Sequence, residues 1–223
     1  MSRLTLLCAL IAIPLEGAPQ TPGHEKGPVV LLPNGWRIAP AGRHISLGDL
    51  PLDMVQSPDG KTLIVTNDGY AKPMLSIVDL ERLQVLHRVP VNDAFLGLAF
   101  HPDGARVFSS GGASGMLHEF RFQKGTLVLG RTIPLSKTVK ESFVAGVSIA
   151  PDGKRLFAVQ VLGNVLNEVD LERGREAKRV PLPAEPYGTL LSADGETLYV
   201  SLWGGAKVLI FDAKTLEAKG AIP

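Results

Sequence analysis

The chain has 223 residues and a mass of 23.8 kDa, and 45% of its residues are hydrophobic. This length fits a single all-β domain, and the apolar content is ample for a core. Its 23 Lys and Arg residues against 22 Asp and Glu residues give a formal net charge of +1. The composition therefore carries no electrostatic signature of nucleic-acid binding or of attachment to a membrane surface.

The N-terminal segment has the pattern of a secretory signal peptide. Arg3 precedes a largely apolar run over residues 4–15, which is too short to span a bilayer as a helix. We expect cleavage near Ala18, so residues 1–18 would be removed and the mature protein would be periplasmic or extracellular. Cys8 is the only cysteine and would be removed as well. The mature chain would then have no disulfide and no thiolate metal ligand.

Residues 19–41 contain several prolines and glycines and show no hydrophobic periodicity. Such a composition is typical of a loop rather than of a helix or strand. We therefore predict that this segment is a linker or leader that precedes the folded part of the chain.

A turn sequence then recurs four times. The copies read Ser-Pro-Asp-Gly at 57–60, His-Pro-Asp-Gly at 101–104, Ala-Pro-Asp-Gly at 150–153 and Ser-Ala-Asp-Gly at 192–195. Their glycines are 44, 49 and 42 residues apart, close to the 40–45 residues of a β-propeller blade. Pro sets φ for a type I turn, Asp caps the turn through backbone amides, and Gly supplies the left-handed residue.

Short runs of β-branched and aromatic residues flank each turn, one before it and three after it. Four strands per repeat is the architecture of a propeller blade, with glycine and small residues in the crowded inner strand. Asp79, Asp170 and Asp212 end third strands and are expected to bind backbone amides of the next turn. The sequence predicts an all-β chain, a β-propeller of four-stranded antiparallel blades over residues 52–91, 95–135, 144–182 and 187–223.

The repeat also resembles a known family. The chain reads Ile-Val-Thr-Asn at 64–67 after the first turn, and the third strand ends in Ile-Val-Asp at 77–79. This pattern resembles the YVTN-type repeat, a lactonase-like and WD40-like propeller family, with Ile in place of Tyr. The resemblance covers residues 42–223. Later copies lose the Asn and have Ser110, Gln160 and Leu202 in its place.

A finer resemblance concerns the start of the chain. Pro-Asn-Gly-Trp at 33–36, Pro-Ala-Gly at 40–42, Gly-Asp-Leu-Pro at 48–51 and Asn-Asp-Gly-Tyr at 67–70 carry it. Together they resemble exported bacterial proteins in which a YVTN propeller precedes an alkaline-phosphatase-like phosphoesterase domain. The resemblance implies a seven-bladed ring and a phosphoesterase domain after Pro223.

One predicted strand has no place in the four blades. Residues 42–48 read like the outer strand of a blade, similar to residues 87–91 and 178–182. An N-terminal strand commonly completes the last blade of a propeller and so protects the sheet edges. We therefore expect that the four blades are an incomplete part of a longer ring, whose missing C-terminal blades belong to the same polypeptide.

In a propeller, the loops that lead into the inner strands and the loops between second and third strands surround one mouth of the channel, the default ligand face. Asp53, Asp93, Glu141 and Glu185 could form a carboxylate set there for calcium or a cationic ligand, or remain separate solvated acids. Trp203 could stack on a ligand or pack between blades. The candidate ligand-binding residues are Asp53, Asn67, Asp68, Tyr70, Asp93, Glu141, Glu185, Tyr187 and Trp203.

The sequence contains no recognisable catalytic motif. Its five histidines lack metal-ligand spacing, and residues 112–115 lack the last glycine of a nucleophile elbow. We expect no catalytic residue and no transmembrane span in the mature chain, and no nucleic-acid partner. The expected function is an exported, non-catalytic binding or scaffold module for an unknown small molecule or protein. The alternatives are the propeller half of a bifunctional phosphoesterase and a lactonase-like or quinoprotein-like propeller enzyme.

Overall fold

The structure is a computed structural model that describes residues 21–25, 27, 29–39, 41–135, 138 and 142–223. The predicted signal peptide and the candidate residue Glu141 lie outside the described residues. The chain divides into two compact units, Met1–His44 and Ile45–Pro223, and each is described by itself. Within the described residues, no helix is both long and apolar enough to cross a membrane.

The first unit contains a small antiparallel sheet within the segment predicted to be a linker. Its strands are β1 (Gly23–His24), β2 (Val30–Leu31) and β3 (Arg37–Ile38). The Arg37 guanidinium donates to both carboxylate oxygens of Glu25 at 3.0 Å. Strands of two residues show no periodicity, and this ion pair joins residues far apart in sequence, so the local pattern did not predict the sheet.

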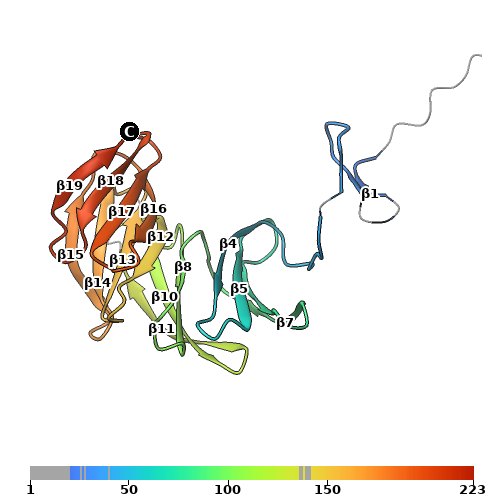
Figure 1. Cartoon of the computed structure of the whole chain (residues 1–223), viewed down its shortest axis with the longest axis horizontal. Helices are drawn as coiled ribbons and strands as arrows, with labels where there is room; N and C mark the ends of the chain where they lie inside the picture. Colours follow the sequence, from blue (N-terminus) through green and yellow to red (C-terminus); the bar gives the residue numbers. More distant parts are fainter. Residues whose placement is uncertain (1–20, 26, 28, 40, 136–137, 139–141) are drawn as a thin grey trace, which may run out of the picture. The chain divides into compact units, whose positions relative to one another are not determined.

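The second unit consists of four antiparallel sheets of four strands each, connected in sequence order (Figure 1). The first blade has β4 (Pro51–Gln56), β5 (Thr62–Asn67), β6 (Met74–Asp79) and β7 (Gln84–Pro90), and the second has β8 (Leu98–Phe100), β9 (Arg106–Ser110), β10 (Met116–Gln123) and β11 (Thr126–Pro134). The third has β12 (Val144–Ile149), β13 (Arg155–Gln160), β14 (Val165–Asp170) and β15 (Arg175–Pro181), and the fourth has β16 (Pro186–Leu191), β17 (Thr197–Leu202), β18 (Lys207–Asp212) and β19 (Ala218–Ile222).

The predicted all-β class and the four-stranded antiparallel blades of a propeller are confirmed by these sheets. Residues 42–48, expected to be a surplus outer strand, form no strand in the structure. Two bonds attach this segment to the first blade instead. The Gly48 amide donates to Asn67 Oδ1 at 3.0 Å, and Arg88 donates to the carbonyl of Ser46 at 3.0 Å.

The repeated turn has the predicted geometry in all four copies. In the first copy the Gly60 amide donates to the Ser57 carbonyl at 2.8 Å, and Asp59 Oδ1 accepts from the Lys61 amide at 3.1 Å. Gly60 has φ of +72°, in the left-handed region that favours glycine. The corresponding glycines of the other turns, Gly104, Gly153 and Gly195, have φ between +67° and +73°.

The second blade departs from the repeat at its outer hairpin. Strands β10 and β11 are joined by Lys124 and Gly125, with φ of +50° and +73°. Two consecutive residues with positive φ are typical of a type I′ hairpin turn. This turn needs no Asp cap, which explains why Arg121 stands where the first blade has Asp79. The longer hairpin also accounts for part of the stretched repeat.

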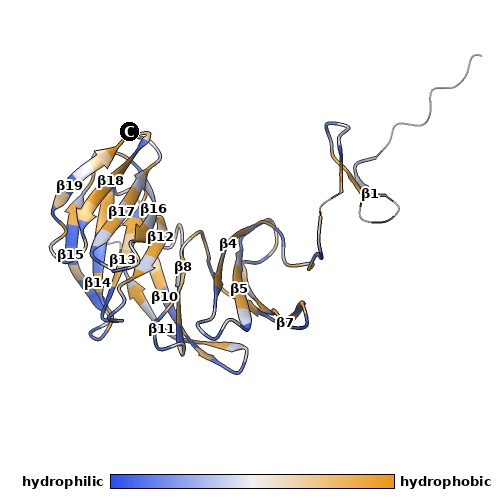
Figure 2. Ribbon diagram, in the orientation of Figure 1, coloured by the Kyte–Doolittle hydropathy of each residue, from blue (hydrophilic) through white to orange (hydrophobic). Residues whose placement is uncertain are grey.

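The core lies between successive blades rather than inside one sheet. Neighbouring residues of a strand point to opposite faces, and on β13 Leu156 and Ala158 pack with the second blade while Phe157 and Val159 pack with the fourth. The middle strands are therefore buried on both faces, and Figure 2 shows long apolar stretches on the strands of the third and fourth blades. Burial of each such side chain stabilises the fold by roughly 1.5–3 kcal/mol.

The inner strands approach one another at glycines, as the sequence predicted. A methyl group added at Gly97 would lie 2.2 Å from the Ala145 carbonyl oxygen, and one at Gly146 would lie 2.7 Å from the Gly188 Cα. These distances are far below van der Waals contact, so only glycine permits the spacing. The backbones of the second, third and fourth blades thus meet at the axis.

Candidate functional site

The predicted site residues lie at one end of the blades. The first residue of β4, Pro51, pairs with Asn67 at the end of β5, and Pro186 of β16 likewise pairs with Leu202 at the end of β17. The loop that leads into each inner strand therefore lies beside the loop between the second and third strands. We call the surface formed by these loops the channel-mouth face.

Four aromatic side chains form a continuous row on this face, which we call the aromatic arc. Phe95 and Phe143 meet edge to face with ring centroids 4.6 Å apart, and Phe95 meets Tyr187 at 6.0 Å. Tyr187 in turn meets Trp203 at 5.1 Å. The arc thus connects the second, third and fourth blades through ring contacts of the kind worth about 0.5–1.5 kcal/mol beyond burial.

Phe143 occupies an unusual backbone conformation within the arc. Its φ is +98°, a value that costs energy for a bulky side chain. Residues in such conformations persist where the surrounding structure holds them, and they cluster at functional sites. The contact with Phe95 identifies part of what holds Phe143 in place.

The exposed end of the arc is Trp203, in the turn between β17 and β18, with 74% of its surface accessible. Its ring contacts Tyr187 of the same blade. Tyr187 is half-buried, and together with Ser201 and Leu202 these rings line an open hollow of about 330 Å³. The hollow lies on the face of the fourth blade whose counterpart in the third blade, with Ala145, Val159 and Val161, is buried against the next blade.

Glu185 lies beside Trp203. The Trp203 amide donates to the Glu185 carbonyl at 2.8 Å. A methyl group added at Gly204 would lie only 1.6 Å from Glu185 Oε2, so the carboxylate occupies the space that a side chain at position 204 would need. Glu185 is exposed, and within the described part of the chain it forms no ion pair.

Asp93, in the loop between the first and second blades, is an acidic residue of the same face. Asp93 Oδ1 lies 2.5 Å from His118 Nε2, and His118 Nδ1 lies 3.2 Å from Thr132 Oγ1. Burial would raise the pKa of Asp93, but hydrogen bonds from His118 and Ser114 and the interaction with His118 lower this pKa overall. Asp93 is thus held as a hydrogen-bonded carboxylate.

Asp68 lies close to two other carboxylates. Burial, followed by the negative charges of Asp93 and Asp49, raises the pKa of Asp68. Asp49 Oδ2 accepts from the Ala71 amide at 2.9 Å and thereby fixes the loop. Tyr70, next in this loop, is fully exposed. Together with Leu50 and Gly69, the loop forms a shallow open depression of about 430 Å³.

Two candidate residues have structural partners. Asn67 is buried, its Oδ1 accepts from the Gly48 amide at 3.0 Å, and its Nδ2 donates to the Val65 carbonyl at 3.1 Å and to Ser76 Oγ at 3.0 Å. Both ends of the amide are therefore used, by groups of the first blade and by the segment before it.

Asp53 also connects parts of the fold. Its Oδ1 accepts from the Met54 amide at 2.8 Å, and the Leu98 amide of the second blade also donates to the carboxylate. Burial raises the pKa of Asp53, and these two backbone bonds only partly offset that effect. Asp53 joins the inner strands of the first two blades.

The predicted carboxylate set is not brought together as a metal site in the described residues. No group of three or more His, Cys, Asp or Glu side chains among them could hold a metal ion. Asp93 is engaged by His118, Asp53 by backbone amides, and Glu185 lies beside Trp203 at the far blade. Glu141, the fourth member, lies outside the described residues.

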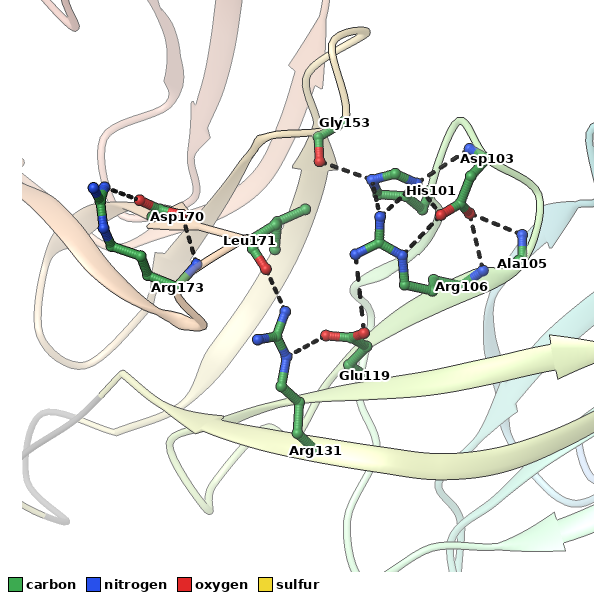
Figure 3. A network of polar contacts seen from close by, with 10 residues as sticks. All are labelled: His101, Asp103, Ala105, Arg106, Glu119, Arg131, Gly153, Asp170, Leu171 and Arg173. Carbon is green, nitrogen blue, oxygen red and sulfur yellow. Dashed lines mark hydrogen bonds and ion pairs between the residues drawn. The ribbon is translucent and has the colours of Figure 1, made fainter.

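The opposite face carries a polar network that joins the second and third blades (Figure 3). His101 Nε2 lies 2.7 Å from the Gly153 carbonyl oxygen. Arg131 of β11 binds both the Glu119 carboxylate and the carbonyl of Leu171. The bonds from His101 to Gly153 and from Arg131 to Leu171 cross from the second blade to the third. The network therefore connects these two blades.

A groove of about 730 Å³ also lies on the opposite face, between turns of the third and fourth blades. It is larger than the hollow at Trp203, but Arg155 and Asp212 of its charged lining are already engaged. Arg155 donates to the Ala213 carbonyl at 2.7 Å, and Asp212 pairs with Lys219 at 2.9 Å. Because these residues shape the turns, we favour the channel-mouth face with its aromatic arc as the candidate site.

Sequence reasoning placed Phe95 and Phe143 in loops of the channel-mouth face but not among the candidate ligand-binding residues, and it missed His118. A signal for the first two was present. Phe95, Phe143 and Tyr187 stand eight, nine and seven residues before the Asp of their Asp-Gly turns. An aromatic residue seven to nine positions before this Asp in three successive repeats predicts a row of rings at one end of the blades.

No family model and no curated protein matches this chain. Solved structures do match its fold. A protein of unknown function from Desulfotomaculum acetoxidans DSM 771 has a TM-score of 0.66 and 17% identity over 77% of this chain and 55% of its own. Hydrazine synthase of Kuenenia stuttgartiensis has a TM-score of 0.61 and 21% identity over 77% of this chain and 48% of its own. At these identities the likeness concerns the propeller-like β fold alone, and the chain spans about half the length of either structure.

Proposed function

We propose that this chain is an exported, non-catalytic binding module whose channel-mouth face takes a ligand. The observation that carries the proposal is the aromatic arc, which runs across the channel-mouth face of the second, third and fourth blades. Ligand sites are lined predominantly by hydrophobic and aromatic side chains. Export is supported by the N-terminal sequence, with Arg3 before an apolar run.

The proposal includes membership of the YVTN-type propellers, on the strength of the Ile-Val-Thr-Asn sequence at 64–67. It also includes further blades of the same polypeptide. Leu190 and Ile222 of the fourth blade are exposed, beside the half-buried Tyr199 and Ile210. The corresponding face of the third blade buries Phe157 and Val159 against its neighbour. A further blade packed on the fourth would cover this apolar face.

A ligand screen by thermal unfolding tests the proposed face. The full chain is heated with separate solute classes, namely monosaccharides, nucleosides, amino acids and alkylammonium salts. A ligand at one hundred times its dissociation constant stabilises a protein by about 2.7 kcal/mol. We expect at least one class to raise the melting temperature by several degrees, and Tyr187→Leu and Trp203→Leu to remove the shift.

Glu196→Gln is the matched control, because Glu196 is exposed and lines the groove on the opposite face. This variant should keep the full shift. A shift that survives both aromatic variants but disappears in Glu196→Gln would place the ligand in the opposite groove and contradict the proposal. A screen in which no class stabilises the protein would contradict it as well.

A further inference from the structure

A pocket of about 160 Å³ lies between the first and second blades. Its apolar lining comes from both blades, with Val89 and Val91 from the end of the first and Phe120 and Leu129 from β10 and β11 of the second. The walls thus belong to two blades that already face each other. A further blade packed on the fourth would therefore leave this pocket uncovered.

The pocket has a polar end formed by His118 and Thr132, which pair across β10 and β11. His118 Nδ1 lies 3.2 Å from Thr132 Oγ1, and Nε2 lies 2.5 Å from Asp93 Oδ1. The bond to Asp93 fixes the orientation of an imidazole that is only 12% exposed. One ring nitrogen and one hydroxyl group are thereby held at the edge of an apolar space.

Comparison with the next junction explains why this space is open. Gln160 and Arg179 of the third blade hold the repeat positions of Ser110 and Thr132. Gln160 Nε2 donates to the Leu135 carbonyl at the end of the second blade at 2.8 Å, and Arg179 donates to Gln160 Oε1 at 3.3 Å. Two long side chains therefore occupy the junction of the second and third blades. The shorter Ser110 and Thr132 leave the corresponding space as a pocket.

The size and lining of the pocket indicate the kind of ligand. An apolar protein cavity of about 150 Å³ accommodates benzene. A hydroxyl group can both donate and accept a hydrogen bond, so it can pair with Thr132 Oγ1 and with His118 Nδ1 in either protonation state of the imidazole. The apolar walls disfavour a charged ligand, because they offer nothing in place of its hydration.

From this geometry we propose that the pocket binds a small neutral phenol. The ring lies among the apolar side chains of the two blades, and the hydroxyl group lies beside Thr132 and His118. This is a second site, beyond the proposed function, because the described residues that line it include no member of the aromatic arc.

Nuclear magnetic resonance of the full chain, labelled with nitrogen-15, locates the ligand directly. The protein is titrated with phenol and with fluorobenzene, which has nearly the same shape and no hydroxyl group. We expect phenol to shift the backbone amide signals of Phe120, Leu129 and Thr132 saturably. Fluorobenzene should bind about fivefold more weakly, because it lacks the hydrogen bond at the polar end.

Variants at Thr132 separate the hydrogen bond from the space. Thr132→Val removes the hydroxyl group and keeps the shape, so phenol should bind about fivefold more weakly and fluorobenzene as before. Thr132→Arg introduces the residue of the third blade and should abolish binding of both molecules. Thr132 is exposed, so both variants should fold, and their amide spectra verify this. Thr126→Val is the control, an exposed threonine of the same strand outside the pocket lining, and should change neither titration.

Several results would overturn the inference, namely no saturable phenol binding, equal affinities for phenol and fluorobenzene, or phenol binding that Thr132→Arg leaves unaltered. Phenol shifts confined to the aromatic arc would overturn it as well, since they would place the ligand on the channel-mouth face. Tyr187→Leu, which removes one ring of the arc, should leave the phenol titration unchanged. Absence of phenol binding, together with a thermal shift from another solute that Tyr187→Leu removes, would reject this pocket and leave the proposed function standing.

Discussion

The imidazole of His101, in the turn between β8 and β9, lies 2.7 Å from the Gly153 carbonyl oxygen in the turn between β12 and β13. The Asp103 amide donates to the other ring nitrogen at 3.1 Å. A residue of the repeated turn in the second blade therefore binds the same turn of the third blade. This contact connects the two blades.

His101→Ala should destabilise the protein. The substitution leaves the buried bond to Gly153 unmade and opens space at a residue that is 6% exposed. Loss of a buried hydrogen-bond partner costs about 1–3 kcal/mol. Urea unfolding measures the effect, with the exposed His87→Ala as control, which should change the free energy of unfolding by less than about 0.5 kcal/mol. Equal stabilities of the two variants would mean that the turn contact contributes nothing.

Two turn glycines give a matched comparison of strain and contact. Gly60 and Gly153 have φ of +72° and +67°, so alanine at either position pays the cost of a left-handed residue, about 1–2 kcal/mol. A methyl group at Gly60 meets nothing closer than 3.6 Å, whereas one at Gly153 lies 2.6 Å from His101 Nε2. Gly153→Ala should therefore lower the melting temperature more than Gly60→Ala. The reverse order would show that the His101 ring moves aside without loss.

Gly97→Ala should be among the most harmful single substitutions at the axis. The added methyl group lies 2.2 Å from the Ala145 carbonyl oxygen, and a backbone atom of the next blade cannot yield as a flexible side chain can. Overpacking of this kind costs about 2–3 kcal/mol. Gly130→Ala in β11 is the control, since its nearest contact is 3.3 Å and its φ is not positive. Chemical denaturation should separate the two variants by about 2 kcal/mol.

The Asp residues that end third strands should make stability depend on pH. Hydrogen bonds from the Arg173 backbone amide and side chain lower the pKa of Asp170, and bonds from Arg82 likewise lower the pKa of Asp79. A pKa that is lower in the folded state than in the unfolded state stabilises the protein above the unfolded value of about 4. This stabilisation is lost as the pH falls below about 4 toward the folded pKa.

Asp170→Asn provides the check, because asparagine keeps an acceptor for the Arg173 amide and does not titrate. The free energy of unfolding should fall less between pH 5 and pH 3 in this variant than in the natural protein. Glu172→Gln, an exposed neighbour in the same turn, should fall as the natural protein does. An identical acid profile for Asp170→Asn would show that this turn does not contribute to acid unfolding.

Much of the fold was predictable because the repeat is local. The Asp-Gly turn uses hydrogen bonds between residues two to three positions apart, so its residue types reveal it without tertiary information. The strand alternation is also local, and it predicted four strands per repeat. The small sheet of the first unit was missed because the pairing of Glu25 with Arg37 depends on distant residues.

The candidate site was predictable only in its location. Loop positions placed Asp68, Tyr187 and Trp203 at one end of the blades, since strand order alone decides which loops are neighbours. The partners within that face were not predictable. The sequence assigned Asn67 to a ligand surface, whereas the structure buries its side chain with partners in the first blade and in the segment before it.

By itself, then, the sequence determined the blades, their turns and which loops lie together at one end of the blades, because each of these follows from contacts within a single repeat. Only the tertiary structure decided which side chains meet across repeats. The pairing of Asp93 with His118, the row from Phe143 to Trp203 and the His101 bond to Gly153 all depend on the rotation and spacing of blades or of their loops. Those quantities are set by close packing at Gly97 and Gly146, where backbones from different repeats meet.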